Sequence, residues 1–255
     1  MSDPINAYLV CGGRWHDFDF ARLELLKLLG EHADVRTQVA PDYSDLDALE
    51  ASDFLITYTC DLEGISEEQE KALQAYVRGG RPWLALHGTN SVMEFLEDGR
   101  VATPRTHGTL MRTLGSQFIA HPLIAPYTVE NAKPEHPLVA GIESFEVEDE
   151  LYLCEYHGEI EGLLSARFTG KALGFVETDW PDDDVRWVMY VHPEGEGEVL
   201  YLTLGHCRGR FDMRPMIDIY PQVERGSWEL PAYLELLRRS LRWCLDGVEK
   251  SQASA

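Results

Sequence analysis

The amino-acid sequence predicts an α/β protein whose core is a mainly parallel sheet with helices packed on both faces. In the first half of the chain, short apolar runs alternate with amphipathic segments at the spacing of βαβ units. Near the other end, an apolar run over 199–204 precedes a closing amphipathic segment. The stretch between them is rich in strand-like pieces, which indicates a β-rich extension of the core. No linker or repeat divides the chain, so we expect one domain over 1–249 and a frayed tail over 250–255.

Four buried strands are expected in the first half. They cover 7–11, 35–39, 54–58 and 82–86. Between the first two, Phe20, Leu23, Leu26 and Leu29 recur at helical spacing, and this helix ends at Gly30. The third strand leads to a capping box, in which the Ser66 hydroxyl accepts from the third helical amide while Gln69 reaches back to the cap. The helix that starts there is expected to end at Gly79.

The second half contains more strands than helices. Strand-like pieces cover 127–129, 145–156, 163–168 and 187–191. The run over 199–204 is a strong buried strand that ends at Gly205 and His206. A last helix is predicted where Leu234, Leu237, Leu241 and Cys244 recur at helical spacing.

The composition fits a folded domain and narrows the class of partner. The chain has 255 residues, 44% of them hydrophobic, which is enough for a core and excludes general disorder. With 44 acidic against 22 basic residues, the formal charge is −22. The electrostatic field of this negative charge repels phosphate backbones and anionic lipid, so we expect neither a nucleic acid nor a membrane as partner. A small molecule is the expected ligand.

The N-terminal residues, the cysteines and the glycine motifs bear on the compartment and on the cofactor. The first residues carry no basic segment followed by an apolar one, so no secretion signal is indicated, and we expect a cytoplasmic protein. Five scattered cysteines without a CxxC pair are typical of reduced thiols. There is no P-loop, and Gly12-Gly13 lacks the third glycine of a dinucleotide fingerprint, so no nucleotide is indicated.

Several polar residues fall at the carboxyl ends of the expected strands, where open parallel sheets bind their ligands. His16 and Asp17 follow the first strand, and Cys60 and Asp61 follow the third. His87 follows the fourth strand, and His206 follows the late strand over 199–204. We predict catalytic roles for His87 and His206, because imidazole suits acid–base chemistry and metal ligation. We predict substrate binding by His16, Asp17, Cys60 and Asp61.

Three further residues complete the predicted site. Glu148-Asp149-Glu150 is most simply a solvated turn, but Glu150 precedes an apolar run and is a candidate acid–base group or ligand. Tyr152, in that run, is a candidate substrate-binding residue. His87, His121 and His206 are candidate ligands of a divalent metal of the zinc or manganese type. His136 precedes a proline, and the pattern leaves open whether it joins them. For each histidine the alternative is a capping or packing role.

The turn after the fourth strand excludes one common chemistry. A nucleophile elbow needs serine or cysteine there, and Leu86-His87-Gly88 has histidine instead. Serine or cysteine hydrolysis at this turn is therefore not expected.

Six segments in order resemble the trehalose-utilisation (ThuA-like) family over nearly the whole chain. They are the helix from Ser66 to Gly80, the strand 83–87, the run 114–122, the stretch 136–142, the residues 149–152, and the stretch 195–206. The resemblance implies the flavodoxin-like, three-layer fold of class I glutamine amidotransferases. It also implies that His87 stands where amidotransferases carry their cysteine, and that His206 stands where their catalytic histidine follows a strand. Glutamine hydrolysis is therefore not expected.

The resemblance further implies sugar catabolism, with a disaccharide or its 3-keto derivative as substrate. Two segments depart from the family pattern: Leu86-His87-Gly88-Thr89-Asn90 is more polar after the histidine, and Trp15-His16-Asp17-Phe18 adds a histidine-bearing loop. Two hypotheses follow. The first is an enzyme, either a 3-keto-glycoside hydrolase or lyase or a sugar isomerase. The second is a non-catalytic module that binds a ligand or partner. Histidines that converge on one point favour the enzyme. A homodimer is compatible with both.

Overall fold

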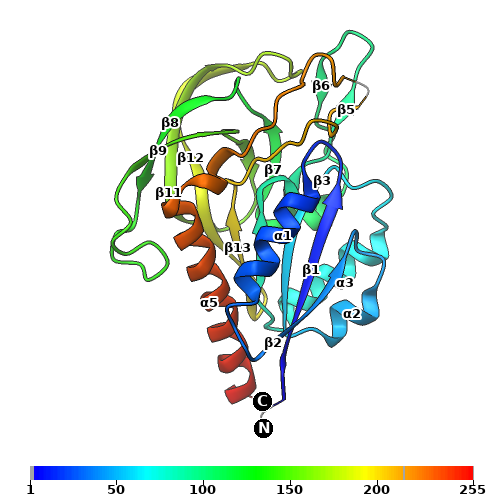
Figure 1. Cartoon of the computed structure of the whole chain (residues 1–255), viewed down its shortest axis with the longest axis vertical. Coiled ribbons are helices and arrows are strands. Elements are labelled where there is room, and N and C mark those ends of the chain that lie inside the picture. Colours follow the sequence, from blue (N-terminus) through cyan, green and yellow to red (C-terminus); the bar gives the residue numbers. More distant parts are fainter. Residues whose placement is uncertain (1–2, 215, 255) are drawn as a thin grey trace.

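A nine-stranded mixed sheet organises the computed structural model, which describes residues 3–214 and 216–254, with side chains as far as residue 250 (Figure 1). The strand order is β2-β1-β3-β4-β13-β12-β11-β8-β9. The first five strands in this order run parallel, and the remaining pairs are antiparallel. The predicted β-rich extension is therefore the continuation of the parallel sheet.

The parallel half contains β1 (Ile5–Gly13), β2 (Val35–Ala40), β3 (Phe54–Cys60), β4 (Trp83–Leu86) and β13 (Gly197–Leu202). The antiparallel half contains β8 (Ala125–Asn131), β9 (Phe145–Asp149), β11 (Glu161–Lys171) and β12 (Asp179–Glu194). Two small two-stranded sheets pair β7 (Ser116–Ala120) with β10 (Leu153–Tyr156), and β5 (Glu94–Phe95) with β6 (Val101–Ala102).

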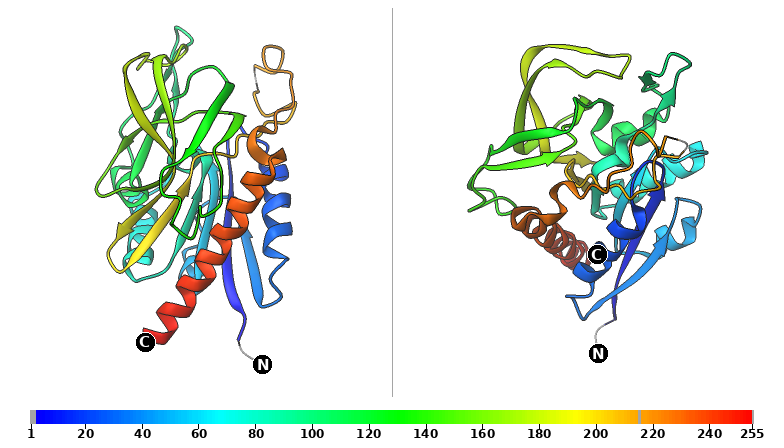
Figure 2. Two further views of the ribbon diagram at one scale, coloured as in Figure 1. Left: turned by 90° about the vertical axis from the view of Figure 1, so that its left-hand side faces the viewer. Right: turned by 45° about the horizontal axis from the view of Figure 1, so that its top comes forward.

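Helices cover both faces of the sheet and make three layers (Figure 2). On one face lie α1 (Phe18–Leu29) and α5 (Pro231–Ser254). On the other lie α2 (Leu46–Ala51), α3 (Glu67–Arg78) and α4 (Gly108–Leu114). Two 3-10 turns, η1 (His87–Asn90) and η2 (Gly226–Glu229), complete the helical elements, and η1 directly follows β4. This is the α/β three-layer fold that the sequence predicts.

Alternation along the central strands builds the two cores. In β1, Leu9 and Cys11 pack with α1 and α5, whereas Tyr8 and Val10 pack with α2 and α3. The predicted capping box is present at the start of α3. Gln69 N donates to Ser66 Oγ at 3.2 Å, and Ser66 N donates to Gln69 Oε1 at 2.8 Å.

Two expectations about elements need comment. The predicted strand over 145–156 is wrong as one element, because it ends at Asp149 and restarts at Leu153 in a different sheet. At the other end of the chain, α5 continues to Ser254, so its backbone is helical across most of 250–255; fraying there stays a prediction.

Close backbone approach fixes the end of β1. Gly13 has φ +128°, and a Cβ there would lie 2.0 Å from the Cys60 carbonyl oxygen. β1, β3, β4 and β13 end at neighbouring positions in register, with Gly13 opposite Cys60 and Leu202 opposite Leu86. Their following loops therefore meet at one edge of the sheet.

Candidate functional site

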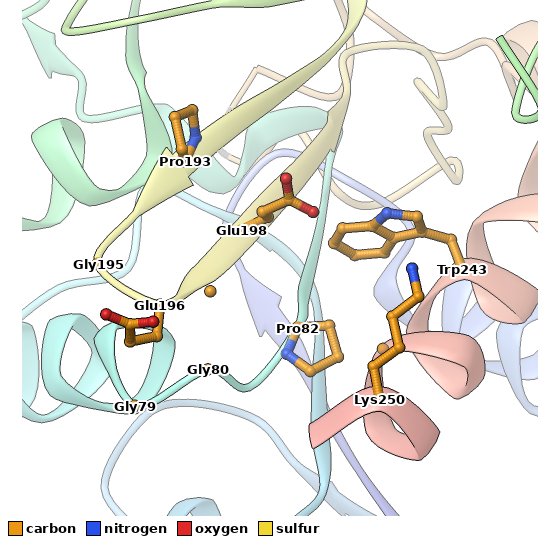
Figure 3. A pocket seen from close by; sticks show the side chains of 11 residues that line it. Gly79, Gly80, Pro82, Pro193, Gly195, Glu196, Glu198, Trp243 and Lys250 are labelled. Carbon is orange, nitrogen blue, oxygen red and sulfur yellow. The ribbon is translucent and has the colours of Figure 1, made fainter. Parts of the chain in front are cut away.

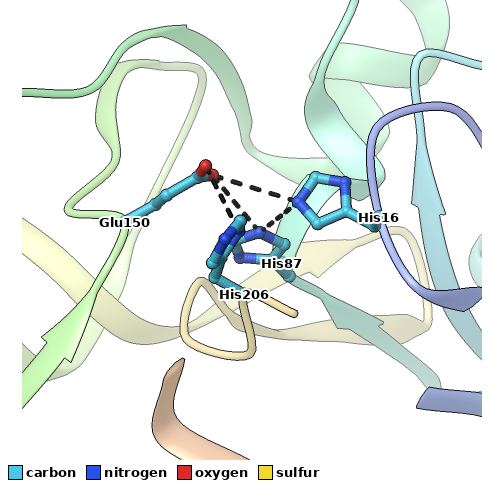
Figure 4. A group of neighbouring side chains, drawn as sticks. All are labelled: His16, His87, Glu150 and His206. Carbon is cyan, nitrogen blue, oxygen red and sulfur yellow. Dashed lines mark hydrogen bonds and ion pairs between the residues drawn. The ribbon is translucent and has the colours of Figure 1, made fainter. Parts of the chain in front are cut away.

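Four side chains from four strand ends converge at this edge (Figure 4). His16 follows β1, His87 opens η1 directly after β4, Glu150 follows β9, and His206 lies beyond β13. Each offers one ligand atom, and these atoms lie within 4.8 Å of one another. All four residues are buried, with exposed fractions between 0% and 6%. We call this group the cage.

The distances across the cage are short. His87 Nε2 lies 2.9 Å from His16 Nε2 and 3.5 Å from Glu150 Oε2. His206 Nδ1 lies 3.2 Å from Glu150 Oε1, and His16 Nε2 lies 4.0 Å from Glu150 Oε2. The backbone at His87 has φ +45°, a left-handed conformation that is rare for a residue with a side chain. His87 adopts this conformation at the position where its imidazole joins the cage.

The outward nitrogen of each imidazole faces a hydrogen-bond acceptor. His87 Nδ1 lies 2.8 Å from the Thr203 carbonyl oxygen, and His16 Nδ1 lies 3.4 Å from the Arg14 carbonyl oxygen. His206 Nε2 lies 2.7 Å from Glu224 Oε2. Because a carbonyl or carboxylate oxygen can only accept, these nitrogens carry the proton in the neutral rings. The inward nitrogens are then lone-pair acceptors.

The pKa shifts of two cage residues favour the charge states that a metal ion needs in its ligands. Burial by itself raises the pKa of Glu150, but His206, His121 and His87 together hold that pKa well below its ordinary value of 4.5. Burial and then the neighbouring His87 lower the pKa of His16 well below 6.5. Near neutral pH, Glu150 is therefore an anion and His16 is neutral, which are the protonation states that metal ligands require.

His206 behaves differently. Burial lowers its pKa, but Glu150 and Glu224 outweigh burial and raise the pKa above 6.5. Its inward Nδ1 is buried and has no hydrogen-bond partner among the described residues. A proton and a metal ion therefore compete for the same position next to Glu150 Oε1.

The donor set fits a small divalent cation. Two ligands of a tetrahedral zinc ion lie about 3.3 Å apart, given metal–ligand bonds of about 2.0–2.1 Å. Four of the six cage separations, 2.9, 3.2, 3.5 and 4.0 Å, bracket that value, and all six lie within 4.8 Å. Three imidazoles and one carboxylate suit zinc and the neighbouring transition metals. The 2.9 Å contact between His16 Nε2 and His87 Nε2 requires either a proton or a metal ion between the two nitrogens, because two bare lone pairs would repel.

His121, a predicted metal ligand, lies beside the cage. Its Nε2 is 3.6 Å from Glu150 Oε1, and its Nδ1 is 2.7 Å from the Pro122 carbonyl oxygen. Its side chain is 25% exposed, against 6% or less for the four cage side chains. The Nε2 lone pair is therefore open to a ligand that enters from solvent. His16 and Glu150 stand in the convergent group instead.

Tyr152 and His16 are the predicted substrate-binding residues that reach the cage. Tyr152 lies in the break between β9 and β10, and its hydroxyl is 3.3 Å from His87 Nε2. Burial raises the pKa of Tyr152 well above 10, so this hydroxyl keeps its proton and is a donor. The break in the predicted strand thus places both Glu150 and Tyr152 in the site.

The other three predicted substrate-binding residues contact the segments that carry the cage. Asp17 caps α1, accepting from Phe20 N at 3.1 Å. Cys60 is buried and packs against Gly88. A Cβ at Gly88 would lie only 2.7 Å from the Cβ of Cys60. Asp61 accepts from Arg14 Nε at 3.0 Å and Trp15 Nε1 at 3.0 Å. Asp61 therefore fixes the loop that carries His16.

Asp149 contradicts the expectation of a solvated turn. It is 1% exposed and accepts from four backbone amides. The donors are Glu150 N at 2.7 Å, Gly205 N at 3.1 Å, His206 N at 3.2 Å and Ser227 N at 2.9 Å. One buried carboxylate therefore joins the ends of β9 and β13 to η2 and positions two members of the cage.

The sequence reasoning also missed Arg208 and Glu224. Arg208 NH1 lies 3.0 Å from Glu224 Oε2, and its NH2 lies 3.7 Å from Glu150 Oε1. The backbones of Arg208 and Glu224 exchange hydrogen bonds of 2.9 and 2.8 Å, which close a loop over 209–223. Arg208 follows His206 by two residues, so the strand-end rule could have found it; Glu224 lies in a loop that carries no such signal.

Two neighbouring surface hollows lie away from the cage. One of about 520 Å³ is at the opposite edge of the sheet, between the turn before β13 and α5, with Trp243 in its wall (Figure 3). A neighbouring hollow of about 380 Å³ shares Trp243 and includes His136, so His136 does not join the site. Neither is lined by a member of the cage. No described helix has the length and apolarity to cross a bilayer.

Comparisons with known proteins agree with the fold. A ThuA-like protein from Bacteroides uniformis ATCC 8492 superposes with a TM-score of 0.65 at 16% identity, covering 96% of this chain and 93% of that one. A ThuA-like protein from Parabacteroides merdae ATCC 43184 gives 0.60 at 17% identity, with 94% and 90% covered. A GMP synthase-type protein from Thermoplasma acidophilum gives 0.55 at 11% identity, with 99% and 100% covered. A comparison with curated proteins finds no match.

The architecture and these structures define a protein with the glutamine amidotransferase-like α/β fold. A family model described as trehalose utilisation matches residues 10–220, and the chain belongs to this ThuA family. A role in carbohydrate utilisation follows from that membership.

Proposed function

We propose that this protein is an enzyme of carbohydrate utilisation that acts on an oxidised sugar, such as a 3-keto-glycoside, at a divalent cation held by the cage. The observation that carries the proposal is the convergence of four buried lone-pair donors, His16, His87, Glu150 and His206, on one point. A cation bound there would polarise a sugar carbonyl as a Lewis acid.

The residues around the cage supply the groups for proton transfer. The Nδ1 of His121 faces the Pro122 carbonyl oxygen, so Nε2 is the nitrogen of this ring that can accept a proton from a substrate. Tyr152 offers a hydroxyl that stays protonated. The two stand on different sides of the cage, His121 next to Glu150 and Tyr152 next to His87. One group can therefore accept a proton while the other donates one.

A 3-keto-glycoside uses both groups. The bond between C2 and its hydrogen is acidic because it lies next to the C3 ketone, and His121 Nε2 accepts that proton. The electron pair first moves onto the C3 carbonyl oxygen as an enolate, and then forms a double bond between C2 and C1 as the bond from C1 to the glycosidic oxygen breaks. The departing oxygen takes the Tyr152 proton. The products are an unsaturated keto sugar and the free alcohol.

Two alternatives receive less support. A glutamine amidotransferase needs a reactive thiolate at the elbow, which here is His87; the nearby Cys60 is buried, and burial raises its pKa well above 9. A non-catalytic module has no need for imidazoles whose tautomers are set by Thr203, Arg14 and Glu224. The convergence of the histidines favours the enzyme.

Turnover of a 3-keto-disaccharide by the metal-loaded protein tests the proposal. Appearance of the unsaturated keto sugar is followed by its ultraviolet absorbance, with the parent disaccharide as the unreactive control. We expect His121→Asn to lower kcat at least about 100-fold while metal remains bound. His136→Asn is the matched control, because His136 lies in a separate hollow. Absence of turnover by the wild type, or full activity of His87→Ala, contradicts the proposal.

A further inference from the structure

Arg208 lies against the cage and has a buried donor without a partner among the described residues. The residue is 8% exposed and its side chain is 10% exposed, so Arg208 is about nine-tenths buried. NH1 contacts Glu224 at 3.0 Å, but NH2 is 3.7 Å from Glu150 Oε1, beyond hydrogen-bond distance. Its Nε is buried and has no hydrogen-bond partner in the described part of the chain. A guanidinium has five N–H donors, and here the Nε donor has neither a protein partner nor access to solvent.

The surroundings hold the guanidinium in place. Glu224 lies on one side, Glu150 on another, and the Tyr220 ring centroid is 5.5 Å from the guanidinium carbon. A charged group that is buried without its hydrogen bonds costs free energy. The two nearby carboxylates do not by themselves accept all the hydrogen bonds that the guanidinium can donate. An oxygen-bearing ligand in the site would complete them.

Arg208 and the cage share Glu150 Oε1. His206 Nδ1 is 3.2 Å from this oxygen, His121 Nε2 is 3.6 Å from it, and Arg208 NH2 is 3.7 Å from it. A ligand bound at the cage therefore lies within reach of both the His121 lone pair and the Arg208 donors. His121, the proposed base, and the Arg208 guanidinium lie on the same side of the site. This is its more exposed side, because the side chains of His121 and Glu224 are 25% and 32% exposed.

We propose that Arg208 binds a negatively charged oxygen of the sugar ligand and so sets the specificity of this site for oxidised sugars. This inference rests on the proposed function. When His121 takes the proton next to the ketone, the electron pair of the broken bond moves toward the carbonyl and places negative charge on its oxygen. Arg208 donates hydrogen bonds to that charge, which is larger in the transition state than in the ground state. A sugar carboxylate carries such a charge permanently.

Binding of D-gluconate and D-sorbitol to the metal-loaded protein tests this role without any turnover. The two probes share a five-carbon polyol chain and differ at the sixth carbon, which is a carboxylate in gluconate and a hydroxymethyl group in sorbitol. By isothermal titration calorimetry we expect the wild type to bind gluconate at least about tenfold more tightly than sorbitol, as a charge-assisted hydrogen bond provides. Arg208→Met should remove the preference, and Arg208→Lys should restore part of it.

Arg210→Met is the matched control, because Arg210 is exposed, belongs to the same loop and contacts the Phe211 ring rather than the cage. Elemental analysis of each variant shows whether the metal remains. Equal binding of the two probes to the wild type, including no measurable binding of either, overturns the role of Arg208, as does a preference that survives in Arg208→Met. A wild type that holds no metal contradicts the proposed function instead, so the two failures are distinguishable.

Discussion

The site depends, residue by residue, on which nitrogen of each imidazole carries the proton. The Thr203 carbonyl and the Glu224 carboxylate settle this for His87 and His206 from outside the cage. Such outer partners are worth testing, because they act on metal affinity without touching the metal.

Replacing Glu224 by alanine removes the acceptor that orients His206. We expect the affinity for the metal to fall by about 10–100-fold, since the Nδ1 lone pair is no longer held inward. Competition with a chromophoric chelator measures the change. Glu229→Ala is the control, because Glu229 is an exposed carboxylate on η2. An unchanged affinity in Glu224→Ala rules out this orienting role.

Asp149 is a second residue with a large expected effect. Asparagine in its place keeps one acceptor but turns an amide toward the backbone donors of Gly205 and Ser227. We expect the free energy of unfolding to fall by about 2–3 kcal/mol, as measured by urea denaturation. Glu148→Gln should change it little, because Glu148 is exposed. Equal stability of the two variants would show that the network around Asp149 contributes little.

At the scale of elements, the site is an assembly of loops held by carboxylates. Strand ends placed His16, His87 and His206 together as the sequence predicts, because parallel strands end at one edge. Glu150 was found from its position before an apolar run, but the break that exposes it to the cage was not. Periodicity cannot show that Leu153 joins a different sheet from Asp149, since both segments are extended and follow one another closely in the chain.

The Arg14 to His16 loop gives a prediction at this scale. Asp61 does not belong to the cage, yet it accepts from Arg14, Trp15 and Met93. With Asp61→Asn, we expect the loop to loosen and metal affinity to fall about tenfold, because His16 is presented less accurately. If instead Asp61 contacts the sugar, as its position after β3 suggested, metal affinity stays constant and only the KM for substrate rises.

For the whole molecule, the alternation of strands and helices was enough to predict the three-layer core. It could not predict that the extension continues the same sheet, since strand order across β13, β12 and β11 depends on long-range pairing. The sequence also predicted free thiols, and all five cysteines are buried and unpaired by disulfides.

Buried thiols make the fold sensitive to alkali. Burial raises the pKa of Cys11 and of Cys154 from 9.0 to about 12. Between these values the folded state binds more protons than the unfolded chain, so the free energy of unfolding falls as the pH rises above about 9. Urea midpoints should decrease steadily from pH 8 to pH 10.5. Constant midpoints over that range would mean that these thiols ionise without unfolding.

The central claim is that the cage holds a metal ion, and elemental analysis of untagged protein tests it most directly. We expect nearly one equivalent of zinc, manganese or a neighbouring transition metal per chain in the wild type. His87→Ala combined with His206→Ala should lose it, while His136→Asn, outside the cage, should keep it. A folded wild type that takes up no divalent metal, even when dialysed against it, would contradict the claim.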